Sequence, residues 1–195
     1  MSAFEFVLIS FAIIVGLGVS EVLAGWADQI RARARLRPYP LQLLSSAFIL
    51  YLSIQYLWLM WGGRVIEWTF PRFLAVTGPV LALALAARVC RMDTSPGASP
   101  FRDQYFRVSP AIYTLLAAFP LFITAMSLFS DLREMVPDPP NLLLVTVVRL
   151  SVLGLYIALA LSRSERFHKV GIGLLWLTAI GFLVRMGQRL EASAP

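Results

Sequence analysis

The stretch "NLLLVTVVRLSVLGLYIALALS", residues 141–162, decides the fold. As a helix it is long enough to cross roughly 30 Å of hydrocarbon, and nearly all of its side chains are apolar or small. One residue departs from this pattern, because Arg149 places a permanent positive charge near the middle. The stretch predicts a membrane-spanning helix whose arginine requires an explanation.

Composition extends this prediction to the whole chain. Of its 195 residues, 58% are hydrophobic and only 14% are charged, which exceeds what a soluble domain needs for its core. The apolar runs are too long and too uniform for barrel strands. We therefore expect an all-α, polytopic integral membrane bundle in a single transmembrane domain, residues 1–195. Its six predicted spans are residues 4–25, 41–62, 71–89, 109–130, 141–162 and 170–186.

The placement of basic residues predicts the orientation. Eleven of the 17 lysines and arginines fall in the first, third and fifth connectors. Because Lys and Arg accumulate on the cytoplasmic side of a bilayer, both termini are expected on the outer side of a bacterial cytoplasmic (inner) membrane. The run "RARARLR", residues 31–37, is then a short connector beside anionic lipid headgroups, and nucleic acid is not an expected partner.

Small residues recur at four-residue spacing, which lets membrane helices approach closely. Such spacing predicts tight packing, either within one chain or between subunits. A homo-oligomer and a complex with a membrane partner protein are therefore both compatible with the sequence. The three ridges are Ala12, Gly16, Ser20 and Ala24 in the first span, Gly78, Ala82 and Ala86 in the third, and Gly154, Ala158 and Ser162 in the fifth.

The first two spans carry a resemblance. "FEFVLISFAIIVGLGVSEVLAG", residues 4–25, is followed after the basic loop by the aromatic run "QYLWLMWG", residues 55–62. This third of the chain resembles an uncharacterised family of small multi-pass bacterial membrane proteins. The resemblance implies a membrane location and no particular activity.

Arg149 is the strongest candidate for a functional residue. It lies eight residues inside its span, or roughly 12 Å, too deep for its side chain to reach the surface easily. An unpaired charge there costs several kcal/mol, so it should face protein or water. Thr146 and Tyr156 share its helix face, and Gln55 lies at nearly the same depth. Together they predict a ligand-binding pocket that opens outward and favours an anionic or hydrogen-bonding ligand.

Two further expectations concern the surroundings of this pocket. Tyr51 and Trp58 share the face of Gln55, which predicts an aromatic wall beside the guanidinium. The fifth span also carries its small residues on the face opposite Arg149. Because both faces require neighbours, this helix is expected to be central in the assembly.

Glu21, in the cytoplasmic half of the first span, is the second intramembrane candidate. Its expected partner is Arg88 at the cytoplasmic end of the third span, since Arg149 lies at a different depth. Glu21 and Arg149 pair only if the long arginine side chain points inward. For both residues, a structural pair and a ligand-binding role stay open.

No pattern for catalysis is present. His168 is the only histidine and is expected in a basic cytoplasmic turn, and Cys90 is the only cysteine. Paired haem ligands, a zinc site and a histidine-based triad are thereby excluded, so the sequence predicts no enzyme, no cofactor and no metal. Tyr113 and Trp176 are interpreted as packing residues.

Two functions fit these observations. The first is a non-enzymatic multi-pass membrane scaffold or interaction component. The alternative is a small transporter, channel or ligand-binding membrane protein with an outward pocket around Arg149, in which Glu21 serves as a proton-linked or gating group.

Overall fold

The structure, a computed structural model, describes residues 2–61, 67–128 and 142–192. All regular structure in these ranges is helical, as predicted, and five helices are long and apolar enough to cross a membrane. The sixth, α6, contributes a shorter apolar stretch, Thr146–Leu161. The helices are α1 (Ala3–Ala32), α2 (Pro40–Trp61), α3 (Phe70–Val89), α4 (Phe101–Leu128), α6 (Leu142–Leu161) and α7 (Glu165–Ala192). Of the predicted outer connectors, residues 63–66 of the first and all of the second, residues 131–140, lie outside the described residues.

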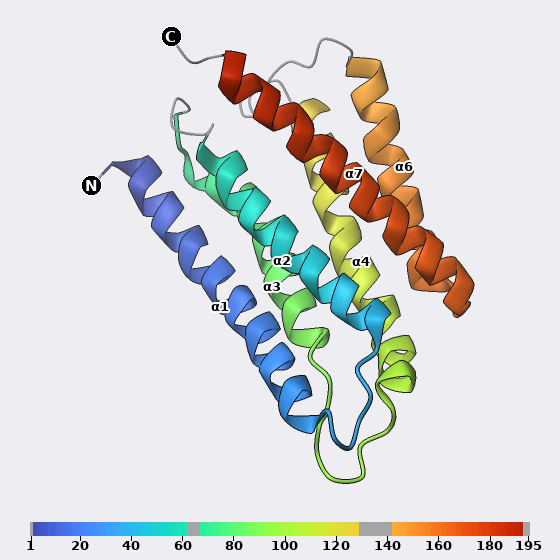
Figure 1. The fold of residues 1–195 in the computed structure, drawn as a ribbon. Helices are drawn as coiled ribbons and strands as arrows, with labels where there is room; N and C mark the ends of the chain where they lie inside the picture. Colours follow the sequence, from blue (N-terminus) through green and yellow to red (C-terminus); the bar gives the residue numbers. More distant parts are fainter. Residues whose placement is uncertain (1, 62–66, 129–141, 193–195) are drawn as a thin grey trace.

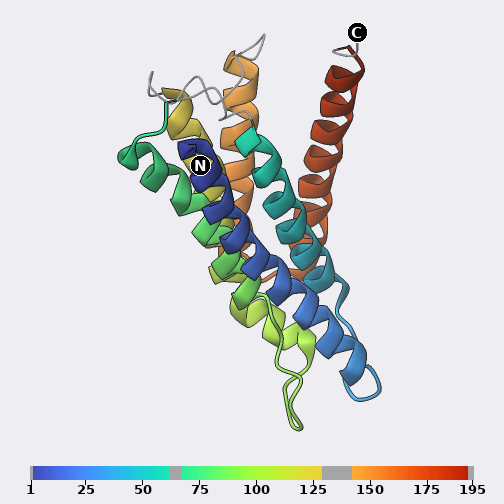
Figure 2. The ribbon, with the colours of Figure 1, turned by 90° about the vertical axis from the view of Figure 1, so that its left-hand side faces the viewer.

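Helices that follow one another along the chain run antiparallel and form one bundle (Figure 1). Helix α3 packs against α1 and α4, and α4 packs against α6. Helix α7 crosses over α2 and touches α6. The connections 33–39, 90–100 and 162–164 lie together at one end of the bundle, which we call the basic end, and both chain termini lie at the other (Figures 1 and 2).

The close contact between α1 and α3 depends on a glycine outside the predicted ridge. A Cβ on Gly18 would lie 3.2 Å from the Cα of Ala84, so a larger residue there would push the helices apart. The ridge residues Ala12, Gly16 and Ser20 instead point away from the bundle, and a Cβ on Gly16 would meet nothing within 4 Å. These three ridge residues therefore do not pack against the described part of the chain.

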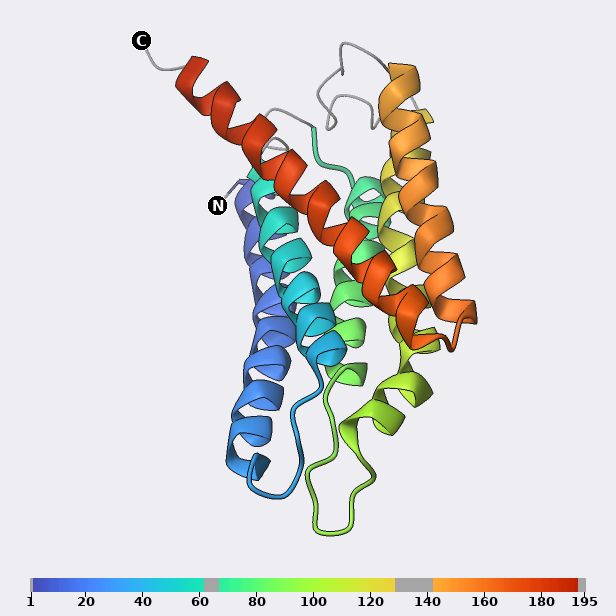
Figure 3. The ribbon, with the colours of Figure 1, turned by 45° about the vertical axis from the view of Figure 1, so that its right-hand side comes forward.

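Several helices extend beyond the predicted spans, because hydropathy marks the hydrocarbon layer and not the helix end. Helix α1 starts with a capping box, in which Glu5 N–H donates to Ser2 Oγ at 3.2 Å and Ser2 N–H donates to the Glu5 carboxylate at 2.8 Å. Helix α4 begins at Phe101, eight residues before its predicted span, and contains Pro110. Figure 3 shows its first turns out of line with the rest, as a proline kink produces.

Buried amides fix the connection between α3 and α4. Gln104 accepts from the backbone N–H of Asp93 at 2.7 Å and donates to the carbonyls of Asp93 and Ser99 at 2.9 and 2.7 Å. Gln42 of α2 donates to the carbonyl of Cys90 at 3.1 Å. These bonds satisfy backbone groups of the connection, which have no partner in a helical hydrogen-bond pattern. They hold the basic end in one arrangement.

Gly16 and Gly18 of α1 give a matched test of this packing. Gly18→Ile should lower the stability of the protein by about 1–3 kcal/mol, because the side chain must displace the α3 backbone. Gly16→Ile adds the same side chain on the outward face and should leave stability almost unchanged. Thermal unfolding of both variants in one detergent measures the difference. Equal losses would contradict the packing of α1 described above.

Candidate functional site

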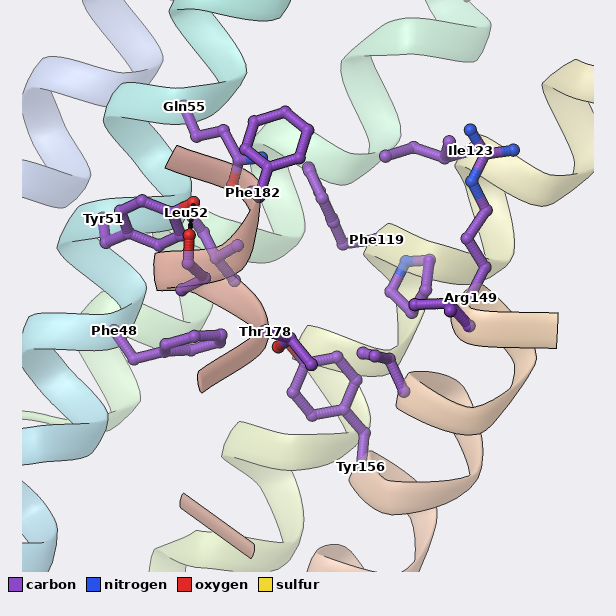
Figure 4. A pocket seen from close by; sticks show the side chains of 14 residues that line it. Phe48, Tyr51, Leu52, Gln55, Phe119, Ile123, Arg149, Tyr156, Thr178 and Phe182 are labelled. Atoms are coloured by element: carbon purple, nitrogen blue, oxygen red, sulfur yellow. Dashed lines mark hydrogen bonds between the residues drawn. The ribbon is translucent and has the colours of Figure 1, made fainter. Parts of the chain in front are cut away.

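A cavity of about 180 Å³ lies between α2, α4, α6 and α7 (Figure 4). Most of its wall is apolar or aromatic, and the polar side chains come from α2, α6 and α7. The residues around it are Phe48, Tyr51, Leu52 and Gln55 of α2, Phe119, Pro120 and Ile123 of α4, Val148, Arg149, Val152 and Tyr156 of α6, and Thr178, Ala179 and Phe182 of α7.

The cavity exists because α6 and α7 diverge. Helix α7 is held on α2 by two hydrogen bonds from side chains to carbonyls, Tyr51 Oη to Ala179 and Trp176 Nε1 to Leu44, both 3.3 Å long. After Ala179 the described residues of α7 up to Val184 are exposed. In Figure 3, α6 and α7 meet near the basic end and separate toward the other end. The space between them opens sideways out of the bundle.

Three polar side chains in this cavity have hydrogen-bonding capacity that no described residue uses. The Nη1 atom of Arg149 is buried and has no hydrogen-bond partner. The Tyr156 hydroxyl and the Gln55 amide also make no hydrogen bond within the described part of the chain, and Tyr156 is only 2% exposed. A buried donor without a partner costs about 1–3 kcal/mol, more when it is charged.

Figure 4 shows how these groups are arranged. The guanidinium of Arg149 lies beside Ile123, and Gln55 lies on the far side of the cavity behind Phe182. The Tyr156 ring extends from α6 toward Thr178 of α7. The polar groups are therefore too dispersed to bond to one another, but they surround a common space.

The structure brings together most of the residues predicted for this pocket. Arg149, Gln55 and Tyr156 all line the cavity, and Tyr51 supplies part of the aromatic wall. Thr146 is half-buried on α6 and does not line it. Trp58 was expected in the aromatic wall, but its side chain is 53% exposed and lies outside.

Within the single chain, the arginine-bearing helix is not central, contrary to what its two faces suggested. Helix α6 lies at one edge of the bundle and packs against α4 and α7 (Figure 3). Its Gly154 is exposed, and a Cβ there would meet nothing within 4 Å. The small-residue face of α6 therefore does not need a neighbour within the chain.

Glu21 lies in a separate ion-pair cluster between α1 and α3. It accepts hydrogen bonds from Arg88, as predicted, and from Arg91 at 3.2 Å. Arg91 also donates to Asp28 at 2.7 Å, and the bonds to Asp28 and Glu21 together raise the pKa of Arg91 above its ordinary value. The structure gives Glu21 no contact with Arg149. Arg91 was missed because it follows the end of α3, where helix periodicity no longer predicts its direction.

A second group of residues was not recognised in the sequence. His168 lies within α7 and not in a turn, and its side chain is fully buried. Its Nδ1 lies 2.8 Å from the hydroxyl of Tyr105, which lies 3.0 Å from the hydroxyl of Tyr113. Because the partners are on α4, more than fifty residues earlier, no local pattern could indicate this contact.

The comparisons with known proteins add no identification. No protein-family model, curated protein or solved structure matches the chain. The resemblance of the first two helices stays a prediction. Within the described residues, no three metal-binding side chains of the His, Cys, Asp and Glu types come together.

The two intramembrane charges should respond to neutralisation in opposite ways. Arg149→Met removes a buried charged donor that has no partner, so the ligand-free protein should become more stable by about 1–3 kcal/mol. Glu21→Gln breaks two ion pairs and should lower stability by up to about 1 kcal/mol. Thermal unfolding in detergent measures both. A loss of stability in Arg149→Met would indicate a structural partner for the arginine.

Proposed function

We propose that this chain is a non-enzymatic, multi-pass membrane protein that binds an amphipathic anion in the cavity around Arg149. The observation that carries the proposal is the buried Nη1 of Arg149, which no described residue satisfies. A ligand that accepts a hydrogen bond there would offset the cost of the unpaired group. Among the buried side-chain atoms of the described chain that make no hydrogen bond, it is the one that belongs to a charged group.

The chemistry of the cavity defines the ligand class. A guanidinium binds carboxylates and phosphates through paired N–H donors, and such charge-assisted bonds are stronger than neutral ones. The Tyr156 hydroxyl and the Gln55 amide supply further donors for the head of the same ligand. The remaining wall, which includes Phe119 and Ile123, is suited to an apolar body. The ligand is therefore a molecule with a phosphate or carboxylate head and a hydrocarbon chain.

The sideways opening supports entry of this ligand from the bilayer. Val148 of α6 and Phe182 of α7 line the cavity and are 47% and 39% exposed. Apolar side chains at the mouth of a cavity suit contact with lipid chains better than contact with water. An amphiphile already dissolved in the membrane can reach Arg149 between α6 and α7 without crossing an aqueous phase.

The orientation is part of the proposal. Ten of the sixteen arginines lie in the three connections of the basic end or on the helix turns next to them, which supports a cytoplasmic location for this end, with anionic lipid headgroups around it. The chain would then cross the inner membrane of a bacterium six times, with α6 as the shortest apolar span. Arg149 and the mouth of the cavity would lie in the outer half of the bilayer.

A scaffold role is the second candidate, and the outward face of α1 favours it. Ala12, Gly16 and Ser20 are exposed there, and small residues at this spacing allow two helices to pack closely in lipid. Self-association through this face would leave the cavity accessible, because α1 and α6 lie at opposite sides of the bundle (Figure 1). The two roles are therefore compatible in one protein.

Binding can be tested with a defined amphiphile. In phosphatidylcholine nanodiscs, dodecyl phosphate or dodecanoate should raise the unfolding temperature of the protein, with a stabilisation of about 2.7 kcal/mol at a hundredfold excess over Kd. Dodecanol, which has the same chain without the charge, should give no comparable shift. Gln55→Ala should weaken binding about tenfold at most, as expected for the loss of one neutral hydrogen bond.

Arg149→Met is the decisive variant for this test. It keeps an unbranched side chain but removes the guanidinium, and should abolish the shift produced by both anions, while Arg149→Lys should retain part of it. Glu21→Gln, which changes a charge far from the cavity, serves as the control and should bind normally. Equal stabilisation of the wild type and Arg149→Met would refute an anion site at this arginine.

Self-association has its own matched pair of variants. Gly16→Ile should reduce energy transfer between donor- and acceptor-labelled copies in liposomes, because the branched side chain prevents close helix packing. Gly173→Ile places the same side chain on an exposed position of α7, where a Cβ would also meet nothing within 4 Å, and should leave the transfer unchanged. Transfer that is unaffected by Gly16→Ile would remove α1 as the interface.

A further inference from the structure

A continuous chain of hydrogen bonds joins α2, α4 and α7 on the basic-end side of the cavity. It starts at the carbonyl of Leu41, which lies 2.7 Å from Ser45 Oγ, and Ser45 Oγ lies 2.9 Å from the Tyr113 hydroxyl. It continues through the Tyr105 hydroxyl, at 3.0 Å, to His168 Nδ1, at 2.8 Å. It ends where His168 Nε2 lies 3.0 Å from the carbonyl of Ser162.

The four side chains of this hydrogen-bond chain are isolated from water. Ser45, Tyr105, Tyr113 and His168 are each at most 3% exposed. All five separations fall in the range of ordinary hydrogen bonds, so each of the five links has room for one proton. Both ends are backbone carbonyls, which accept hydrogen bonds and cannot donate them.

When the imidazole of His168 is neutral, the hydrogen-bond chain has too few protons to fill all of its links. Each hydroxyl contributes one proton and a neutral imidazole contributes one, which gives four protons for five links. One link must then place two acceptors opposite each other without a proton between them. An imidazolium contributes two protons, and every link is then occupied.

We propose that this hydrogen-bond chain is a buried proton-binding site, in which His168 takes up one proton and the three hydroxyls turn to complete all five links. In the protonated form Nδ1–H donates to Tyr105, Tyr105 donates to Tyr113, Tyr113 donates to Ser45, and Ser45 donates to the Leu41 carbonyl. Nε2–H donates to the Ser162 carbonyl in both forms. No covalent bond changes, and the proton comes from water.

The groups around His168 disfavour an added positive charge on its imidazole. The hydrogen bond gained on protonation must offset this cost. Helix α7 itself presents Glu165 and Lys169, and α4 presents Arg102, with Glu165 bonded to both cations. Tyr39 packs its ring on that of Tyr105. The ionisable groups near Tyr113 are Cys90, directly after α3, and Tyr156 of α6. None of these groups is an anion free to neutralise the imidazolium.

Remote hydroxyls should therefore control the protonation of His168. Ser45→Ala and Tyr113→Phe each remove one proton and two links, which leaves three protons for three links with a neutral imidazole. Neither residue touches His168 through a hydrogen bond. Both variants should nevertheless lower the pH at which His168 is half-protonated, by on the order of one pH unit for the loss of one hydrogen bond.

The chain contains a single histidine, so this titration can be observed without interference. Protein labelled with ¹⁵N-histidine in detergent micelles gives one pair of imidazole signals, which report the neutral and cationic forms as pH is lowered. The neutral form should carry its proton on Nε2. Tyr39→Phe is the control, because it removes a hydroxyl beside Tyr105 that is not a member of the hydrogen-bond chain, and it should leave the midpoint unchanged.

The outcomes separate this site from the cavity. Lowered midpoints in both Ser45→Ala and Tyr113→Phe, with Tyr39→Phe unchanged, support the proposal, and either variant suffices if the other does not fold. An unchanged or raised midpoint in the folded variants overturns it, as does an imidazole that stays neutral in the wild type until the protein unfolds. Because no amphiphile is added, the result does not depend on anion binding at Arg149.

Discussion

The lack of water in the interior of a membrane protein is the constraint on which this structure depends. Polar groups placed there must find partners within the chain, since an unsatisfied donor or acceptor costs free energy comparable to a lost hydrogen bond. At the basic end, buried glutamines, tyrosines, a serine and a histidine meet this requirement by bonding across helices. These bonds set the relative positions of α2, α4 and α7.

The same constraint explains why the cavity stands apart from the rest of the interior. Four buried side-chain atoms in the described chain have no hydrogen-bond partner: Gln29 Oε1, Tyr39 Oη, Ser109 Oγ and Arg149 Nη1. Three belong to neutral groups, for which the cost is small. Arg149 carries the charge, and it lies where α6 and α7 separate and a ligand can enter. The most costly of these polar groups therefore lies beside a cavity.

The sequence predicted well how deep a residue lies within its span, but predicted poorly toward which neighbour its side chain points. The lengths of the apolar runs predicted an all-helical bundle. Counting residues from the span centres placed Gln55 and Arg149 at nearly the same depth, where the structure has a cavity that both residues line. Gly16 and Gly18 show the limit. The two positions are two residues apart on α1, so side chains placed there would point in nearly opposite directions. Which of the two positions requires a glycine depends on where the neighbouring helix lies. Composition does not contain that information.

Residues of the hydrogen-bond chain show why polar networks are harder to predict than spans. His168 lies in a basic segment, Tyr105 and Tyr113 lie in a largely apolar helix, and Ser45 lies on α2, so each has an ordinary local context. Their relation appears only when three helices are assembled. Tyr113 also packs its ring on Tyr156, with centroids 6.5 Å apart, so the network and the cavity share a boundary. A rotation of the Tyr113 hydroxyl thus takes place beside Tyr156, whose side chain lines the cavity, so Tyr156 provides a direct physical contact between the two sites.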